Sequence, residues 1–152
     1  MKLVDSNEQG YKFIISLGER RLLQNLIKSL QNLPLICPDI SRKDPDKGKK
    51  EERQEMLVAV LKEHRANTVK QASLLLEDSK FTKTNQLLAL YWIISKSELE
   101  TILVALNDLR VSCWYAMGQP LPSEIKEETM LSTTMDAAGF FEEHLLDLIE
   151  ID

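Results

Sequence analysis

The sequence predicts an all-α fold: a single helical domain over residues 1–152, formed by a bundle of about four to six helices. Its 152 residues include only 5 glycines and 5 prolines, and leucine, glutamate, lysine and glutamine, which favour helices, are abundant. Apolar residues recur at helical spacing in several stretches. One stretch, residues 96–117, is apolar on nearly every side, which is typical of a central buried helix.

The N-terminal region predicts a short extended segment followed by a helix. Residues 1–10 are polar, and we expect them to be poorly ordered. Residues 11–15, YKFII, favour an extended conformation, which we place along the side of the bundle. Ser16 and Glu19 fit a capping box, which predicts a helix from there to about residue 33, and Pro34 ends it.

Residues 34–50 predict a flexible loop, because three prolines, one glycine and mixed charges leave little to bury. Our interpretation is a solvated linker. The alternative is that its basic residues contact an acidic partner.

Residues 51–79 predict one long helix of about eight turns. Its apolar stripe consists of Leu57, Val60, Leu61, His64, Thr68, Ala72 and Leu75. This stripe places His64 inside the protein. We expect a hydrogen-bonded core histidine rather than a metal ligand or a catalytic base.

Residues 87–94, LLALYWII, are almost wholly apolar, and periodicity does not distinguish helix from strand in so short a run. Thr82 or Thr84 could cap a helix here, so we predict a short buried helix. A last helix is predicted from about residue 134 to 149, with Ala138 and Phe141 among its inward-facing residues.

The predicted central helix has clear signals at both ends. Ser95 with Glu98, or Ser97 with Glu100, fits a capping box at its start. Gly118 suits the left-handed position that ends many helices, and Pro120 stops further continuation. These signals define a helix over about residues 96–117.

Arg110 is the unusual residue of this helix, since it falls within the stripe of Leu106, Cys113 and Met117. Asn107 lies one turn before it, and Asp108 points to roughly the opposite side. Because a guanidinium in a core is costly without acceptors, we expect Arg110 to be largely buried and bonded to a carboxylate or to carbonyl groups. It would then clamp a neighbouring helix or loop. The alternative is an arginine that binds an anion at the wall of a pocket.

The run from Leu103 to Gly118, especially ALNDLR and the glycine eight residues after Arg110, resembles the signature of a bacterial domain-of-unknown-function family. Members of that family are often encoded beside the Clp protease adaptor ClpS. The matching positions are Asn107, Asp108, Leu109, Arg110 and Gly118, and the chain departs from the pattern at Ile102, Trp114 and Ala116. The resemblance implies a helical fold and a connection with Clp-type proteolysis, but no activity.

The composition and net charge of the sequence argue against two classes of partner, nucleic acids and membranes. The net charge of −5 argues against a general nucleic-acid binder. No apolar run approaches the length of a membrane span, and the N-terminus has no apolar signal region. We therefore expect a cytoplasmic protein without a membrane or nucleic-acid partner, in which Cys37 and Cys113 are reduced.

Few residues suggest catalysis. Two histidines and two separated cysteines do not form a metal-binding motif, and no phosphate-binding or nucleophile motif occurs. We predict no metal, no cofactor and no catalytic residue. The candidate binding residues are Asn107, Asp108, Arg110 and His64.

Our functional hypothesis is a non-enzymatic, cytoplasmic interaction or regulatory protein with a protein partner, either monomer or homodimer. A link with Clp-type regulated proteolysis rests on the resemblance alone. The alternative is a small-ligand-binding protein or an enzyme, with a pocket at Arg110, Asn107 and His64.

Overall fold

The computed structural model describes residues 1–38, 47–125 and 128–150. Its elements are β1 (Lys2–Asn7), β2 (Gly10–Ser16), α1 (Leu17–Ser29), η1 (Leu30–Asn32), α2 (Lys47–Leu74), η3 (Asp78–Lys80), β3 (Phe81–Lys83), β4 (Ala89–Ser95), α3 (Lys96–Ala116), η4 (Pro122–Glu124) and α4 (Met130–Glu150). The fold is therefore mixed α/β, with a four-stranded sheet beside four α-helices. The prediction of an all-α helical bundle is wrong.

The sheet is antiparallel with the strand order β1-β2-β4-β3. Most of the 87–94 run belongs to β4, so the short helix predicted there is wrong. β2 and β4 pair along their whole length, with Phe13 opposite Trp92, so each strand provides backbone hydrogen-bond partners for the other. Thr84 does not cap a helix, and its hydroxyl accepts a hydrogen bond from the backbone N–H of Gln86 in the β3–β4 turn.

One face of the sheet closes one end of the hydrophobic core. Phe13, Trp92 and Ile94 are buried on this face, whereas Ile93, on the opposite face, is 50% exposed. This alternation is that of a strand covered on one side. The Trp92 indole donates to the carbonyl of Leu75 at 3.0 Å, which ties β4 to the end of α2.

The N-terminal residues are more regular than we expected. Residues 2–7 form β1 and pair with β2, so their predicted poor order is wrong. The extended segment predicted over residues 11–15 is confirmed within β2. Gly10 starts this strand so close to β4 that an added Cβ would lie 2.2 Å from the carbonyl oxygen of Ile94, which leaves no space for a side chain.

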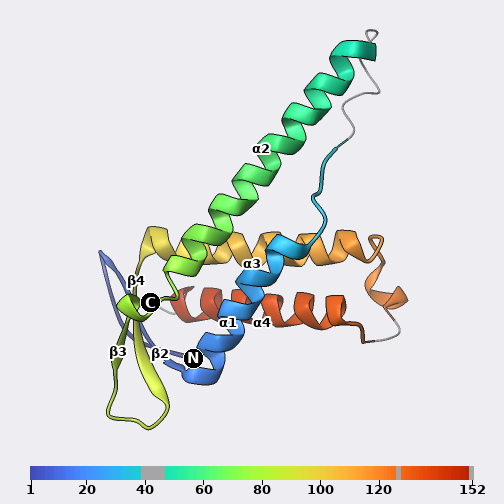
Figure 1. Cartoon of the computed structure of the whole chain (residues 1–152). Coiled ribbons are helices and arrows are strands. Elements are labelled where there is room, and N and C mark those ends of the chain that lie inside the picture. The colour runs from blue at the N-terminus through green and yellow to red at the C-terminus, as the bar shows by residue number, and fades with distance from the viewer. Residues whose placement is uncertain (39–46, 126–127, 151–152) are drawn as a thin grey trace.

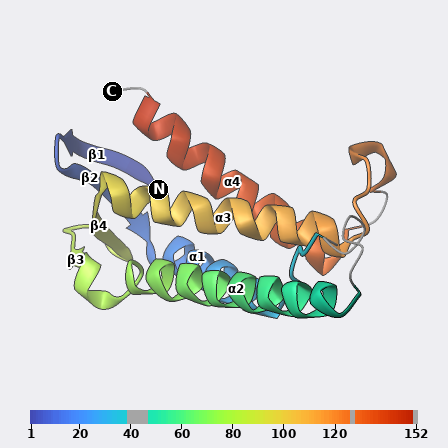
Figure 2. The same ribbon diagram turned by 90° about the horizontal axis from the view of Figure 1, so that it is seen from above.

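The helices lie on two sides of α3. Seen from above, α4 runs beside α3 on one side, while α1 and α2 lie on the other (Figure 2). Capping boxes form at both helix starts: Ser16 with Glu19 for α1, as predicted, and Ser95 with Glu98 for α3, the first of the two predicted alternatives. Each capping box places a helix start directly after a strand.

The core-facing residues of α3 include Leu99, Ile102, Leu106 and Cys113, all buried. The prediction of a central helix that is buried on nearly every side is nevertheless wrong for one face. Its remaining face exposes large apolar side chains by 40–49%: Val104, Val111 and Trp114.

α2 begins at Lys47, so the last residues of the predicted 34–50 loop are helical. The rest of that prediction falls largely on residues 39–46, which lie outside the described residues. Figure 1 shows the N-terminal half of α2 projecting away from the other three α-helices. None of the described helices has the length and apolar composition needed to cross a membrane.

Candidate functional site

The C-terminal half of α2 and the N-terminal half of α3 border a polar groove. It consists of two cavities of about 390 and 600 Å³, which share Asn67, Gln71 and Thr101. The first is otherwise lined by His64, Thr68, Ser97, Glu100 and Val104, and the second by Lys70, Leu74, Leu75, Glu77, Ser79, Lys80 and Glu98. We call this feature the α2–α3 groove.

Helical spacing places two amide side chains next to each other in the groove. Asn67 and Gln71 are four residues apart on α2, so they lie on adjacent turns of one face. Val69 and Ala72 face the core instead and are buried, which fixes the rotation of this half of the helix. No hydrogen bond joins either amide to the described part of the chain, and both are exposed. Each therefore has donors and an acceptor available to a ligand.

The two ends of the groove differ in character. At one end Lys80 forms an ion pair of 2.5 Å with Glu98, and this hydrogen bond is the main cause that lowers the pKa of the Glu98 carboxyl. Leu74, 47% exposed, lies on the same side. At the other end Val104 is 49% exposed beside His64. An apolar side chain is thus available near each end.

Arg65 lies next to the groove and joins three parts of the chain. Its guanidinium donates to the carbonyl oxygen of Leu33 at 2.6 Å, to that of Pro34 at 3.2 Å and to the hydroxyl of Ser112 at 2.9 Å. Ser112, on α3, is only 2% exposed. Arg65 is therefore the structural arginine of this fold, since its donors fix α2 against α3 and against the segment after η1.

Asp108 completes this cluster. Burial raises the pKa of its carboxyl, although the nearby His64 and Arg65 favour the charged form. Burial also lowers the pKa of Arg65, and the charge of Asp108 opposes that shift. Desolvation thus shifts the pKa of both members of this pair in the direction that favours the neutral form.

His64 is exposed at the edge of the groove, so its predicted position inside the protein is wrong. The inner side of α2 runs through Leu61, Arg65, Val69 and Ala72, so Arg65 and Val69 take the places that the predicted stripe gave to His64 and Thr68, one residue earlier. A shift of one residue is a rotation of about 100°, which carries His64 from the core to the surface.

Arg110 is 45% exposed, and the prediction that it is largely buried is wrong. The predicted bond to a carboxylate is confirmed, because its guanidinium donates to Glu142 of α4 at 2.6 Å. Gly139 makes room for this arrangement, since a Cβ there would lie 3.2 Å from the Arg110 Nε atom.

The four predicted binding residues do not gather at one site in the structure. His64 of α2 and Asp108 of α3 lie where these two helices face each other, close enough for an electrostatic interaction. Arg110 lies on the α4 side, and Asn107 is exposed. Neither Asn107 nor Arg110 lines the cavity that His64 lines.

Our sequence reasoning missed Arg65, Asn67 and Gln71. A signal for Arg65 was present, because it lies four residues after Leu61 and four before Val69, in line with two apolar residues. Asn67 and Gln71 carry no such signal, since polar residues on a helix surface are common.

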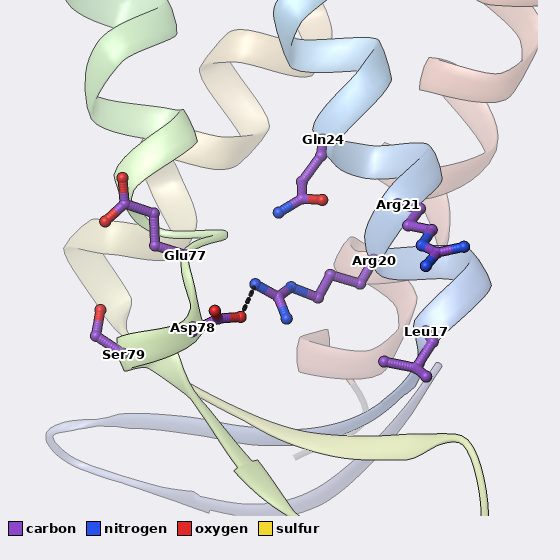
Figure 3. A pocket seen from close by; sticks show the side chains of 7 residues that line it. All are labelled: Leu17, Arg20, Arg21, Gln24, Glu77, Asp78 and Ser79. Atoms are coloured by element: carbon purple, nitrogen blue, oxygen red, sulfur yellow. Dashed lines mark hydrogen bonds and ion pairs between the residues drawn. The ribbon is translucent and has the colours of Figure 1, made fainter.

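A second pocket, of about 590 Å³, lies between α1 and the connection from α2 to β3 (Figure 3). Arg20 points into it and donates to Asp78 at 2.8 Å and to the carbonyl oxygen of Leu76 at 2.9 Å. Gln24 donates to the same carbonyl at 2.8 Å. These side chains satisfy a carbonyl in the segment just after α2, so we assign this pocket a structural role.

Other chemistry-bearing groups are enclosed or scattered. Cys113 is buried, and burial raises the pKa of its thiol, which disfavours the reactive thiolate. Within residues 1–38, 47–125 and 128–150, no three histidine, cysteine, aspartate or glutamate side chains gather as a metal site.

Comparisons of the chain with protein-family models, with curated proteins and with solved structures found no match.

Proposed function

We propose that this protein is a non-enzymatic interaction protein that binds an extended segment of a partner protein in the α2–α3 groove. The observation that carries this proposal is the pair of exposed amides on adjacent turns, Asn67 and Gln71, which line both cavities. Each amide can donate to a peptide carbonyl and accept from a peptide N–H. Leu74 and Val104, partly exposed near the two ends, offer contacts for apolar side chains of the segment.

The disposition of charged groups also favours binding over catalysis. Arg65 donates to carbonyls and a hydroxyl, and Arg110 to a carboxylate, so both arginines already hold protein partners. The alternative of a ligand pocket at Arg110, Asn107 and His64 is less well supported, since the cavity beside His64 does not reach the other two. A cytoplasmic location belongs to the same proposal and is supported by the sequence alone, which has only two, widely separated cysteines. A link with Clp-type proteolysis is supported by the ALNDLR resemblance alone.

The test uses a displayed library of random peptides, selected on the immobilised protein and followed by affinity measurements with the recovered peptides. The double variant Asn67→Ala/Gln71→Ala should weaken their binding by about 5- to 100-fold, because each lost hydrogen bond contributes about 0.5–1.5 kcal/mol.

The matched control is Asn25→Ala/Gln31→Ala, which removes the same two exposed side-chain types from α1 and η1. It should bind the peptides with wild-type affinity. Peptides that bind both double variants equally well would show that the groove is not the binding site, and a library without binders would count against the proposal as a whole.

A further inference from the structure

The projecting half of α2 carries an exposed stripe composed of Arg53, Met56, Val60 and Glu63. Their spacing of three, four and three residues is that of the contact positions in paired helices. Met56 is 68% exposed and Val60 is 60% exposed. Two large apolar side chains flanked by opposite charges therefore face away from the rest of the molecule. We call this surface the α2 stripe.

The opposite face of the same half-helix is already occupied. Gln54 donates to the Cys37 sulfur and to the Pro38 carbonyl oxygen, both at 3.2 Å. Arg65 fixes the next turns to Leu33 and Pro34. Because these contacts set the rotation of the helix, the α2 stripe does not turn inward to bury Met56 and Val60.

The other exposed apolar side chains give no comparable indication of a binding partner. Val104 and Val111 lie on α3. Leu87 and Leu88 stand at the β3–β4 turn, 92% and 67% exposed, the second with a positive φ of 62°. The α2 stripe differs because its apolar centre lies between a cation at one end and an anion at the other. A partner that fits the stripe must therefore carry the opposite order of charges along the same direction.

We propose that a second copy of this chain packs against the α2 stripe, with the two α2 helices antiparallel about a twofold axis beside Val58. In this register Met56 of each copy lies opposite Val60 of the other copy. Arg53 of each copy lies opposite Glu63 of the other. One surface thus complements itself, as a twofold dimer interface requires.

The charges select the antiparallel arrangement. In a parallel pair Arg53 would face Arg53 and Glu63 would face Glu63, and such like-charge contacts oppose association. The antiparallel pair replaces both by attractive contacts. It also leaves room for the two bodies, because each body joins its helix near Arg65, where α2 contacts α3, and the two junctions lie at opposite ends of the pair.

The experiment is sedimentation equilibrium of the full chain from about 1 to about 200 µM, a range suited to a small interface of this kind. We expect the wild-type chain to dimerise. Arg53→Glu and Glu63→Arg should each weaken dimerisation by about tenfold or more, because each turns two attractive contacts into two repulsive ones. The double variant Arg53→Glu/Glu63→Arg should recover wild-type dimerisation.

Mixing the two single variants gives a sharper result. A chain with Arg53→Glu carries acidic groups at both stripe ends, and a chain with Glu63→Arg carries basic groups at both. The mixture should therefore form heterodimers more tightly than either variant forms homodimers. Lys28→Glu on α1 and Glu143→Arg on α4, both at exposed positions, are the matched charge-reversal controls and should not affect dimerisation beyond the change in net charge.

A monomeric wild-type chain over the whole range would overturn the proposal. So would a dimer that the single variants do not weaken, or one that the charge swap does not restore. Circular dichroism of every variant separates these outcomes from loss of folding. The α2 stripe does not include the two groove amides, so the dimer and the peptide site succeed or fail independently.

Discussion

Arg65 and Arg110 both connect α3 to a neighbouring helix, but in different surroundings. Arg65 is partly buried and donates to two carbonyls and to a hydroxyl that is 2% exposed. Arg110 is 45% exposed and donates to one carboxylate, Glu142. Without Arg65, the buried Ser112 hydroxyl loses its partner, whereas without Arg110 water can reach the Glu142 carboxylate, whose side chain is 16% exposed. The difference teaches that the enclosure of the whole contact, more than formal charge pairing, determines the structural importance of an arginine.

The largest effect is expected from Arg65→Ala. It leaves the Ser112 hydroxyl and the Leu33 carbonyl without their donor, so the free energy of unfolding should fall by about 2–3 kcal/mol. Urea denaturation measures this change. Arg21→Ala, at an exposed position on α1, is the control and should change stability by less than about 0.5 kcal/mol. A loss below about 1 kcal/mol at Arg65 would contradict its structural role.

Arg110→Ala should have a smaller effect, up to about 1 kcal/mol, because an ion pair whose guanidinium is 45% exposed contributes little. The loss should shrink further in high salt, since the pair lies within reach of screening ions. Urea denaturation at low and high ionic strength tests both statements. If Arg110→Ala proves as damaging as Arg65→Ala, the contrast between the two arginines is incorrect.

Asp108→Asn tests the electrostatics of the Arg65 cluster. The pKa of Asp108 is raised from the ordinary value of 3.8 by burial, so the folded state disfavours its ionised form. Its contribution to stability is greatest below that ordinary value and is lost as the pH rises through the raised pKa. Asp108→Asn should therefore gain stability relative to the wild type between acidic and neutral pH, by less than about 0.5 kcal/mol after solvent screening. Denaturation curves along a pH series that show a relative loss instead would reverse our assignment of desolvation as the dominant cause.

The smallest effect is expected from Gly139→Ala. Alanine is favoured over glycine inside a helix by about 1 kcal/mol, but the new Cβ would lie 3.2 Å from Arg110. The net gain in unfolding free energy should be a few tenths of a kcal/mol. In the background of Arg110→Ala the same substitution should give nearly the full gain, and a thermal-unfolding double-mutant cycle measures the difference. Equal gains in both backgrounds would show that Arg110 does not restrict this position.

Local features were determined by the sequence itself. The capping boxes of Ser16 with Glu19 and of Ser95 with Glu98 form as predicted, because all of their hydrogen bonds join residues within one turn. The predicted helices over residues 51–79, 96–117 and 134–149 exist, with changed boundaries for the first and the last. Their apolar periodicity is long enough to identify a helix without knowledge of its neighbours.

Other features were decided only by the tertiary structure. The apolar run before α3 became β4 because β2 offers it a partner strand, which local periodicity does not reveal. The rotation of α2 follows from the segment after η1, which Arg65 and Gln54 hold against its inner side. That rotation moved His64 to the surface and left Asn67 and Gln71 in the groove. Strand pairing and helix rotation depend on residues far apart in the chain, so one stretch of sequence does not determine them.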